Sequence, residues 1–200
     1  MTRKEYSAGA VKHSFWFQEF RKVVTLLLDG NGMNDIKVMN QRDNIFAAPT
    51  AARASQIYNT VSARVCSLDS DFYRFFDDGE LVTQKIIVLI AIMNTDTLFF
   101  DFVYEVYREK LIIGDSELLD SDLRVFFKNK QTQDERVAGW KDYTLKRLGT
   151  CYKTFLVEAG VAKRDNGTLS IVKPVLDADL ANCLREHEME QFENALTGVW

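Results

Sequence analysis

The segment WKDYTLKRLGTCYKTFLVEAGVAKRDNGTLSIV, residues 140–172, combines a helix pattern with a hairpin pattern. From Asp142 to Ala159 apolar residues recur at helical spacing, and Gly160 follows, so this part predicts an amphipathic helix that ends at the glycine. Asn166-Gly167 lies between two short strand-forming runs, and both residues tolerate the positive φ of a type I′ turn. The segment therefore predicts a long helix followed by a basic β-hairpin. The predicted inner face of the helix consists of Leu145, Leu148, Tyr152, Phe155 and Leu156.

Two further helix patterns precede this segment. Residues from Leu98 to Ile113 form a strongly apolar run, and residues from Asp120 to about Lys130 place Leu123 and two phenylalanines on one side. Two helices followed by a basic hairpin are typical of a winged helix-turn-helix, which we predict for about residues 98–173. In such a domain the second helix lies in the DNA major groove, and the hairpin reaches the flanking backbone or minor groove.

The candidate DNA-binding side chains lie on the outer arc of the 142–159 helix and on the hairpin. Lysine and arginine there would contact phosphates, which supplies affinity without sequence information. Three of the side chains, Thr144, Arg147 and Thr150, can in principle reach base edges. A winged helix can also serve protein contacts alone, so that alternative stays open. The predicted DNA-binding set in this part of the chain is Lys141, Thr144, Lys146, Arg147, Thr150, Lys153, Lys163, Arg164 and Asn166.

Helical spacing also dominates the first third of the chain. A helix from Trp16 to Leu28 is followed by a glycine-containing stop, a short helix over about 34–41, and a longer helix that Pro49-Thr50 opens. This order resembles a helix-turn-helix, although many helical bundles that bind nothing share it. Arg53, on the longer helix, joins the predicted DNA-binding set. The other basic candidates of this region are expected on solvated faces, namely Arg21, Lys22 and Arg64.

The predicted fold class is all-α, or mainly helical, with two small helical lobes. The first lobe covers residues 1–79 and contains the helix-turn-helix-like pattern. The second covers residues 80–200, with two strongly apolar helices, the winged helix and an acidic helical tail from about Asp177.

Composition excludes several classes of protein. With 200 residues, 46% hydrophobic and 27% charged, and only 2 prolines, the chain is neither collagen-like nor of low complexity. The most apolar run, residues 86–93, is far shorter than the roughly 20 residues that span a membrane, so no membrane insertion is expected. The polar start lacks the apolar core of a secretion signal. Three widely spaced cysteines make a disulfide framework implausible, and we expect a cytoplasmic protein.

The net charge of -4 conceals strong segregation along the chain. Residues 136–173 hold 8 basic and 3 acidic side chains, whereas residues 174–200 hold 1 and 6. The field near a surface follows local charge, so an acidic protein can still present a positive face. The positive segment coincides with the predicted helix and hairpin.

The sequence contains no pattern that indicates catalysis or metal binding. His13 and His187 are the only histidines, and the stretch that follows His187 lacks the second histidine of a zinc-protease helix. Both histidines are expected at the surface. The glycines of residues 29–32 are not followed by the lysine of a phosphate loop. We therefore expect a non-catalytic protein without a cofactor or a metal ion.

Four stretches together resemble a known family. They are YSAGA (6–10), APTAAR (48–53), DFVYEVYREK (101–110) and WKDYTLKRLG (140–149). In order and spacing they resemble the BrxA family, the small NusB-like proteins of bacterial BREX phage-exclusion systems. The resemblance extends from about Tyr6 to Pro174, and the acidic tail departs from it.

The resemblance implies an accessory protein encoded with a methyltransferase, a phosphatase-like protein and large ATPases, in a system that blocks phage replication while methylation marks host DNA. It implies nucleic-acid binding without catalysis, in agreement with the winged-helix prediction. We therefore predict double-stranded DNA as the partner, with other BREX proteins as further partners. The likeness to NusB makes RNA a competing ligand. A third alternative is an adaptor that docks other defence proteins through residues 68–122 or the acidic tail.

Overall fold

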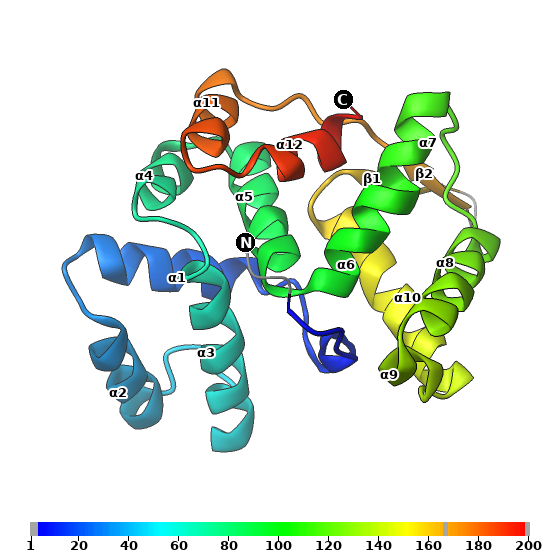
Figure 1. Ribbon diagram of the computed structural model, residues 1–200. Helices are drawn as coiled ribbons and strands as arrows, with labels where there is room; N and C mark the ends of the chain where they lie inside the picture. Colours follow the sequence, from blue (N-terminus) through cyan, green and yellow to red (C-terminus); the bar gives the residue numbers. More distant parts are fainter. Residues whose placement is uncertain (1–3, 166–167, 199–200) are drawn as a thin grey trace.

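The computed structural model describes residues 4–165 and 168–198, and these residues are mainly helical, as predicted (Figure 1). The first part contains the 3-10 turn η1 (Gly9–Lys12) and helices α1 (Phe17–Leu28), α2 (Met33–Asp43), α3 (Ala51–Val65) and α4 (Asp71–Asp78). The central part contains α5 (Leu81–Thr95), then α6 (Thr97–Phe102), the π-helical η2 (Val103–Tyr107) and α7 (Arg108–Ile113), which follow one another directly. The last part contains α8 (Asp120–Gln133), α9 (Glu135–Ala138), α10 (Asp142–Glu158), β1 (Ala162–Asp165), β2 (Thr168–Ile171), α11 (Ala178–Glu186) and α12 (Glu190–Thr197).

Helix α5 is the central element of the hydrophobic core. Its residues 86–93 are at most 1% exposed, because α5 packs against α3 and α4 on one side and against α6 and α10 on the other. The buried apolar residues form one connected cluster from Ala10 to Leu196. The two predicted lobes, residues 1–79 and 80–200, therefore share a core. Their division into separate lobes stays a prediction.

The apolar run of α5 also bears on membrane association. Among the described residues, no single helix is both long and apolar enough to cross a membrane. Helix α5 and the helical stretch 97–113 meet that criterion only as a pair, and the pair is bent by 113°.

The predicted hairpin is present as two short antiparallel strands. Strands β1 and β2 pair so that Asp165 lies opposite Thr168, and the predicted turn, Asn166-Gly167, falls outside the described residues. A bridge between Glu117 and Ser170 adds an extended segment at the other edge of β2. The sequence did not predict this segment, because a single bridged residue has no periodicity to detect.

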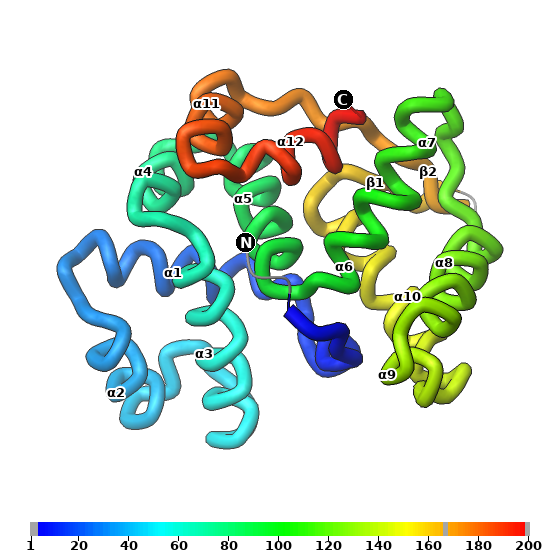
Figure 2. The backbone as a smooth tube through the Cα atoms, viewed as in Figure 1, coloured from blue at the N-terminus to red at the C-terminus, as the bar shows by residue number. Residues whose placement is uncertain are grey.

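The acidic tail is helical, as two separate helices. Helices α11 and α12 are separated at residues 187–189, where Glu188 has a positive φ of 56°. The change of direction lays α12 against η2 and α7, as the red end of the tube in Figure 2 shows. Phe192 is completely buried there, edge-on to Phe100 with ring centroids 5.3 Å apart. The tail is therefore part of the core and not an appendage.

Candidate nucleic-acid interface

Helix α10 places most of its predicted DNA-binding residues on a single exposed arc. The five residues predicted for its inner face are all buried, at 9% exposure or less, as the apolar spacing requires. On the opposite side Lys146, Arg147 and Thr150 are exposed, as is Lys141 just before the helix, while Thr144 and Lys153 are partly covered. The arc also carries Tyr143, which is 69% exposed. Its basic side chains are thus available to a ligand along about three helical turns.

A groove with a volume of about 630 Å³ runs between α8 and α10. Two basic side chains from each helix line it: Arg124 and Lys128 of α8, and Lys146 and Lys153 of α10. The α8 pair was absent from the predicted set. The two residues are four positions apart on the polar side of an amphipathic helix, and this spacing was the sequence signal that could have identified them. The groove extends the positive arc of α10 onto its neighbour.

One lysine of the groove is held by a carboxylate. The Nζ of Lys153 lies 2.6 Å from Oδ1 of Asp120, and 21% of the lysine side chain is exposed. The hydrogen bond and the charge of Lys153 lower the pKa of Asp120, and Arg124 and Lys146 add to this effect. Asp120 is therefore ionised at neutral pH and reduces the positive charge of the groove at its Lys153 end.

The floor of the groove depends on Gly149 of α10. A Cβ atom at this position would lie 3.0 Å from Cδ2 of Leu123 and 3.6 Å from Cε2 of Phe127. Both neighbours belong to α8, so the missing side chain lets the two helices approach closely. This contact explains a glycine in a helix interior, where it costs about 1 kcal/mol relative to alanine.

The basic residues of the hairpin are exposed but divided between two faces. Arg164 lies opposite the buried Leu169, and Lys163 lies opposite Ser170. Neighbouring residues of a strand point to opposite faces, so Lys163 and Arg164 do not share one. Asn166, the third hairpin residue of the predicted set, lies outside the described residues.

The N-terminal segment, residues 6–16 before α1, brings Arg53 of α3 next to α10. Nη1 of Arg53 donates to the carbonyl oxygen of Lys12 at 3.2 Å, and Nη2 of Arg147 donates to the carbonyl oxygen of Val11 at 3.2 Å. Two predicted DNA-binding residues from distant parts of the sequence therefore donate hydrogen bonds to the carbonyl oxygens of two consecutive residues. In Figure 1 this dark blue segment runs between α3 and α10.

The same segment overturns the expectation for Arg64. Its side chain was expected on a solvated face, but the residue is only 3% exposed. Nη1 of Arg64 donates to the carbonyl oxygens of Ser14 and Phe15, both at 2.9 Å. Residues 14–15 cover this side of α3, and helical spacing alone does not reveal a cover from elsewhere in the chain.

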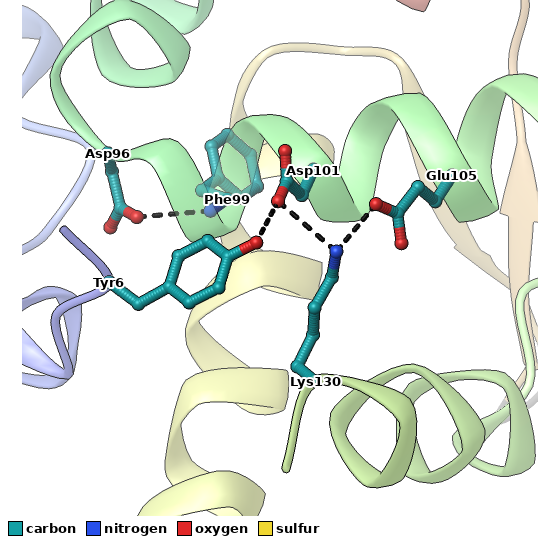
Figure 3. A network of polar contacts seen from close by, with 6 residues as sticks. All are labelled: Tyr6, Asp96, Phe99, Asp101, Glu105 and Lys130. Carbon is teal, nitrogen blue, oxygen red and sulfur yellow. Dashed lines mark hydrogen bonds and ion pairs between the residues drawn. The ribbon is translucent and has the colours of Figure 1, made fainter. Parts of the chain in front are cut away.

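A partly buried polar network anchors the start of the segment (Figure 3). The Tyr6 hydroxyl donates to Asp101 of α6, and Nζ of Lys130 lies 3.2 Å from the same carboxylate and 2.6 Å from Oε1 of Glu105. Burial disfavours the charged form of Lys130, but the hydrogen bonds and charges of the two carboxylates outweigh it and raise the lysine pKa. Nearby, Asp96 caps α6 by accepting from the Phe99 amide. The network ties the N-terminal segment to α6, η2 and α8.

The two histidines are less exposed than expected. His13 is partly buried, and Nδ1 and Nε2 of His187 lie 2.9 Å and 3.4 Å from carboxylate oxygens of Asp69 and Asp71. These contacts tie the loop after α11 to the start of α4. Within residues 4–165 and 168–198, no group of three or more histidine, cysteine, aspartate or glutamate side chains is arranged to hold a metal ion.

Comparison with known proteins identifies the family. A family model described as BrxA matches residues 4–188. The chain belongs to the BrxA family. A curated relative, the BREX protein BrxA of Bacillus cereus strain H3081.97, is 40% identical over 180 residues, which is 90% of each chain. The BrxA match contains all of the predicted DNA-binding residues and ends before α12.

A solved structure shares the fold. The crystal structure of an uncharacterized protein from Magnetospirillum magneticum superposes with a TM-score of 0.82 and covers 98% of this chain and 100% of its own. The two sequences are 20% identical, so this likeness concerns the fold alone.

Proposed function

We propose that this BrxA-family protein binds double-stranded DNA as a non-catalytic accessory protein of a BREX-type phage-defence system. Family membership and the name of the curated relative support the BREX assignment. The observation that carries the DNA-binding part is the exposed basic arc of α10, which continues into the groove beside α8. Lysine and arginine on one helix face attract the phosphate backbone and release its counterions.

We assign the stretch from α6 to β2 as a winged helix. A helix is followed by the short extended segment at Glu117, then by α8, α10 and the hairpin, with Glu117 bridged to β2. In this assignment α10 is the recognition helix in the major groove, and the hairpin contacts the flanking backbone. Because most candidate contacts are with phosphates, binding is mainly electrostatic and has weak sequence preference.

Charge reversal at Lys146, Arg147 and Lys163 together tests this interface. We expect the triple glutamate variant to lose at least tenfold in duplex DNA affinity, about 1.4 kcal/mol, because three attractive side chains become repulsive. Fluorescence anisotropy with a labelled duplex measures the loss, and circular dichroism verifies folding. The matched control is a triple glutamate variant of exposed residues on α2 and α4, namely Lys37, Arg42 and Arg74. A folded test variant with unchanged affinity would contradict the interface.

The nature of the nucleic acid needs a separate comparison. Duplex DNA, duplex RNA and single strands are titrated with the protein at several salt concentrations. The logarithm of the duplex DNA association constant should fall linearly with the logarithm of salt concentration, with a slope of about 0.9 per phosphate contacted. Tighter binding to RNA would favour the NusB-like alternative, and no binding near 50 mM salt would remove the DNA proposal.

Exposed apolar side chains favour an adaptor as the second candidate function. Within residues 68–122, Leu81 is 53% exposed, Val82 59% and Ile113 72%. Side chains of this kind are often buried at protein interfaces, although single exposed ones are common. Co-purification with the BREX methyltransferase, phosphatase-like protein or ATPase after nuclease treatment, abolished by Ile113→Ser, would support this function.

A further inference from the structure

The positive surface of α10 continues across the N-terminal segment onto α3. Lys12 of η1 is exposed, and its carbonyl oxygen accepts from Arg53 and, at 3.3 Å, from Nε2 of Gln56. Arg147 donates to the preceding carbonyl, that of Val11. The side chains of Arg53 and Arg147 are therefore gathered around two consecutive peptide groups, and the exposed Lys12 between them adds a third positive charge to this segment.

The two arginines in this cluster are held in place while some of their donors stay unused. Arg53 donates both of its side-chain hydrogen bonds from Nη1, to the carbonyl oxygen of Lys12 and to Oε1 of Gln56. Its guanidinium carbon lies 5.0 Å from the ring centroid of Trp16. Arg147 uses Nη2 for its bond and lies 5.7 Å from the ring centroid of Tyr143. A guanidinium carries five N–H groups, so each arginine keeps donors for a ligand. An arginine side chain that is already ordered against an aromatic ring loses less conformational entropy when it binds a ligand.

The backbone of the segment is also unusual at this point. Trp16 has a φ of 55° and a ψ of 49°, the left-handed conformation that bulky residues rarely adopt. The residue is 7% exposed, and its ring centroid lies 5.8 Å from that of His13. The conformation places the indole beneath Arg53, so it contributes to the ordering of that side chain.

The charges of three cationic side chains act on the imidazole of His13. Burial, followed by the charges of Arg64, Arg53 and Lys12, lowers the pKa of His13 to about 4. Such cationic groups attract anions, and phosphate is an anion that the donor fork of arginine binds bidentately.

We propose that Lys12, Arg53 and Arg147 form a phosphate-binding patch through which duplex DNA on α10 extends onto α3. The inference rests on the proposed DNA binding and adds to it a footprint longer than that of a single winged helix. The N-terminal segment holds the patch together, because its carbonyl groups fix Arg53 and Arg147 side by side. The patch and the α8–α10 groove then contact separate phosphates of one duplex.

The test compares wild-type protein with the double variant Lys12→Gln and Arg53→Gln on duplexes of about 10 and 20 base pairs, that is, about one and two helical turns. We expect the variant to lose tenfold or more in affinity for the longer duplex and clearly less for the shorter one. The salt slope on the longer duplex should fall by about 2, since two phosphates at about 0.9 each lose their partners. The matched control is Lys37→Gln with Arg74→Gln, two exposed residues outside the patch.

A charge-preserving variant separates binding from folding. Lys12→Arg with Arg53→Lys keeps both charges, so it should keep the salt slope, and thermal melting shows whether each variant is folded. The inference is overturned if the folded neutral variant binds both duplexes like wild type. The proposed function would still stand in that case if the triple glutamate variant of Lys146, Arg147 and Lys163 binds duplex DNA more weakly than wild type. If wild-type protein binds no duplex, the proposed function and the patch fail together.

Discussion

Lys130 is a charged residue that the fold buries and pairs. Only 3% of its side chain is exposed, and its ammonium lies between the carboxylates of Asp101 and Glu105. Desolvating an ammonium is costly, and an ion pair with good geometry offsets that cost. The Asp101 side chain is 4% exposed and interacts with both Lys130 and the Tyr6 hydroxyl.

Replacement of Lys130 by methionine should destabilise the protein strongly. The expected loss in the free energy of unfolding is about 3–5 kcal/mol, because Asp101 stays buried without its cation. Urea denaturation measures the loss. Glu105→Gln serves as the control, since 43% of the Glu105 side chain is exposed and its loss should cost about 1 kcal/mol or less. Equal small losses in both variants would show that the network contributes little to stability.

Gly149 allows two elements to form a groove. A side chain at this position of α10 would push against Leu123 and Phe127 of α8. Replacement of a mid-helix glycine usually stabilises a helix, so the helix alone favours a larger residue here. The packing of α8 on α10 opposes that preference.

Gly149→Val should therefore destabilise the protein by about 2 kcal/mol, as overpacking of a close helix contact does. DNA affinity should fall as well, because α8 carries Arg124 and Lys128 away from α10. Thr150→Val, at the adjacent exposed position, is the control for stability. Urea denaturation measures the free energy of unfolding of the two variants. A Gly149→Val protein more stable than wild type would show that the packing of α8 on α10 does not require a glycine at this position.

Local patterns were enough to predict most elements but not all of them. The helices that became α1 and α10 were predicted close to their observed bounds, because each has a long apolar stripe and a glycine shortly after its last turn. Helix α9 has four residues, too few for a periodic pattern. The break between α11 and α12 falls at Glu188, where neither glycine nor proline marks it.

At the scale of the whole molecule, α12 completes the core although it lies beyond the BrxA match. Phe192 is fully buried against Phe100, and Leu196 is fully buried as well. The connected core joins α12 to helices from both predicted lobes. A destabilising substitution in α12 should consequently lower the stability of the whole protein.

Phe192→Ala should lower the free energy of unfolding by about 3–5 kcal/mol, the usual cost of a cavity of this size. Circular dichroism and tryptophan fluorescence should report one coincident transition for wild type and variant, since both lobes share a core. Val175→Ala is the control, because Val175 is 91% exposed and its truncation should change stability by less than about 0.5 kcal/mol. Two separate transitions would instead support independent lobes.

The amino-acid sequence by itself determined the helical class, the inner face of α10 and the hairpin, because these depend on residues two to four positions apart. Only the tertiary structure decided what each basic side chain does. It buries Arg64 and Lys130, turns Arg124 and Lys128 toward the groove, and places Arg53 beside Arg147. The contacts that hold Arg53 and Arg147 span 41 and 136 residues of sequence. The burial and pairing of a charge depend on such distant segments, and local spacing carries no information about them.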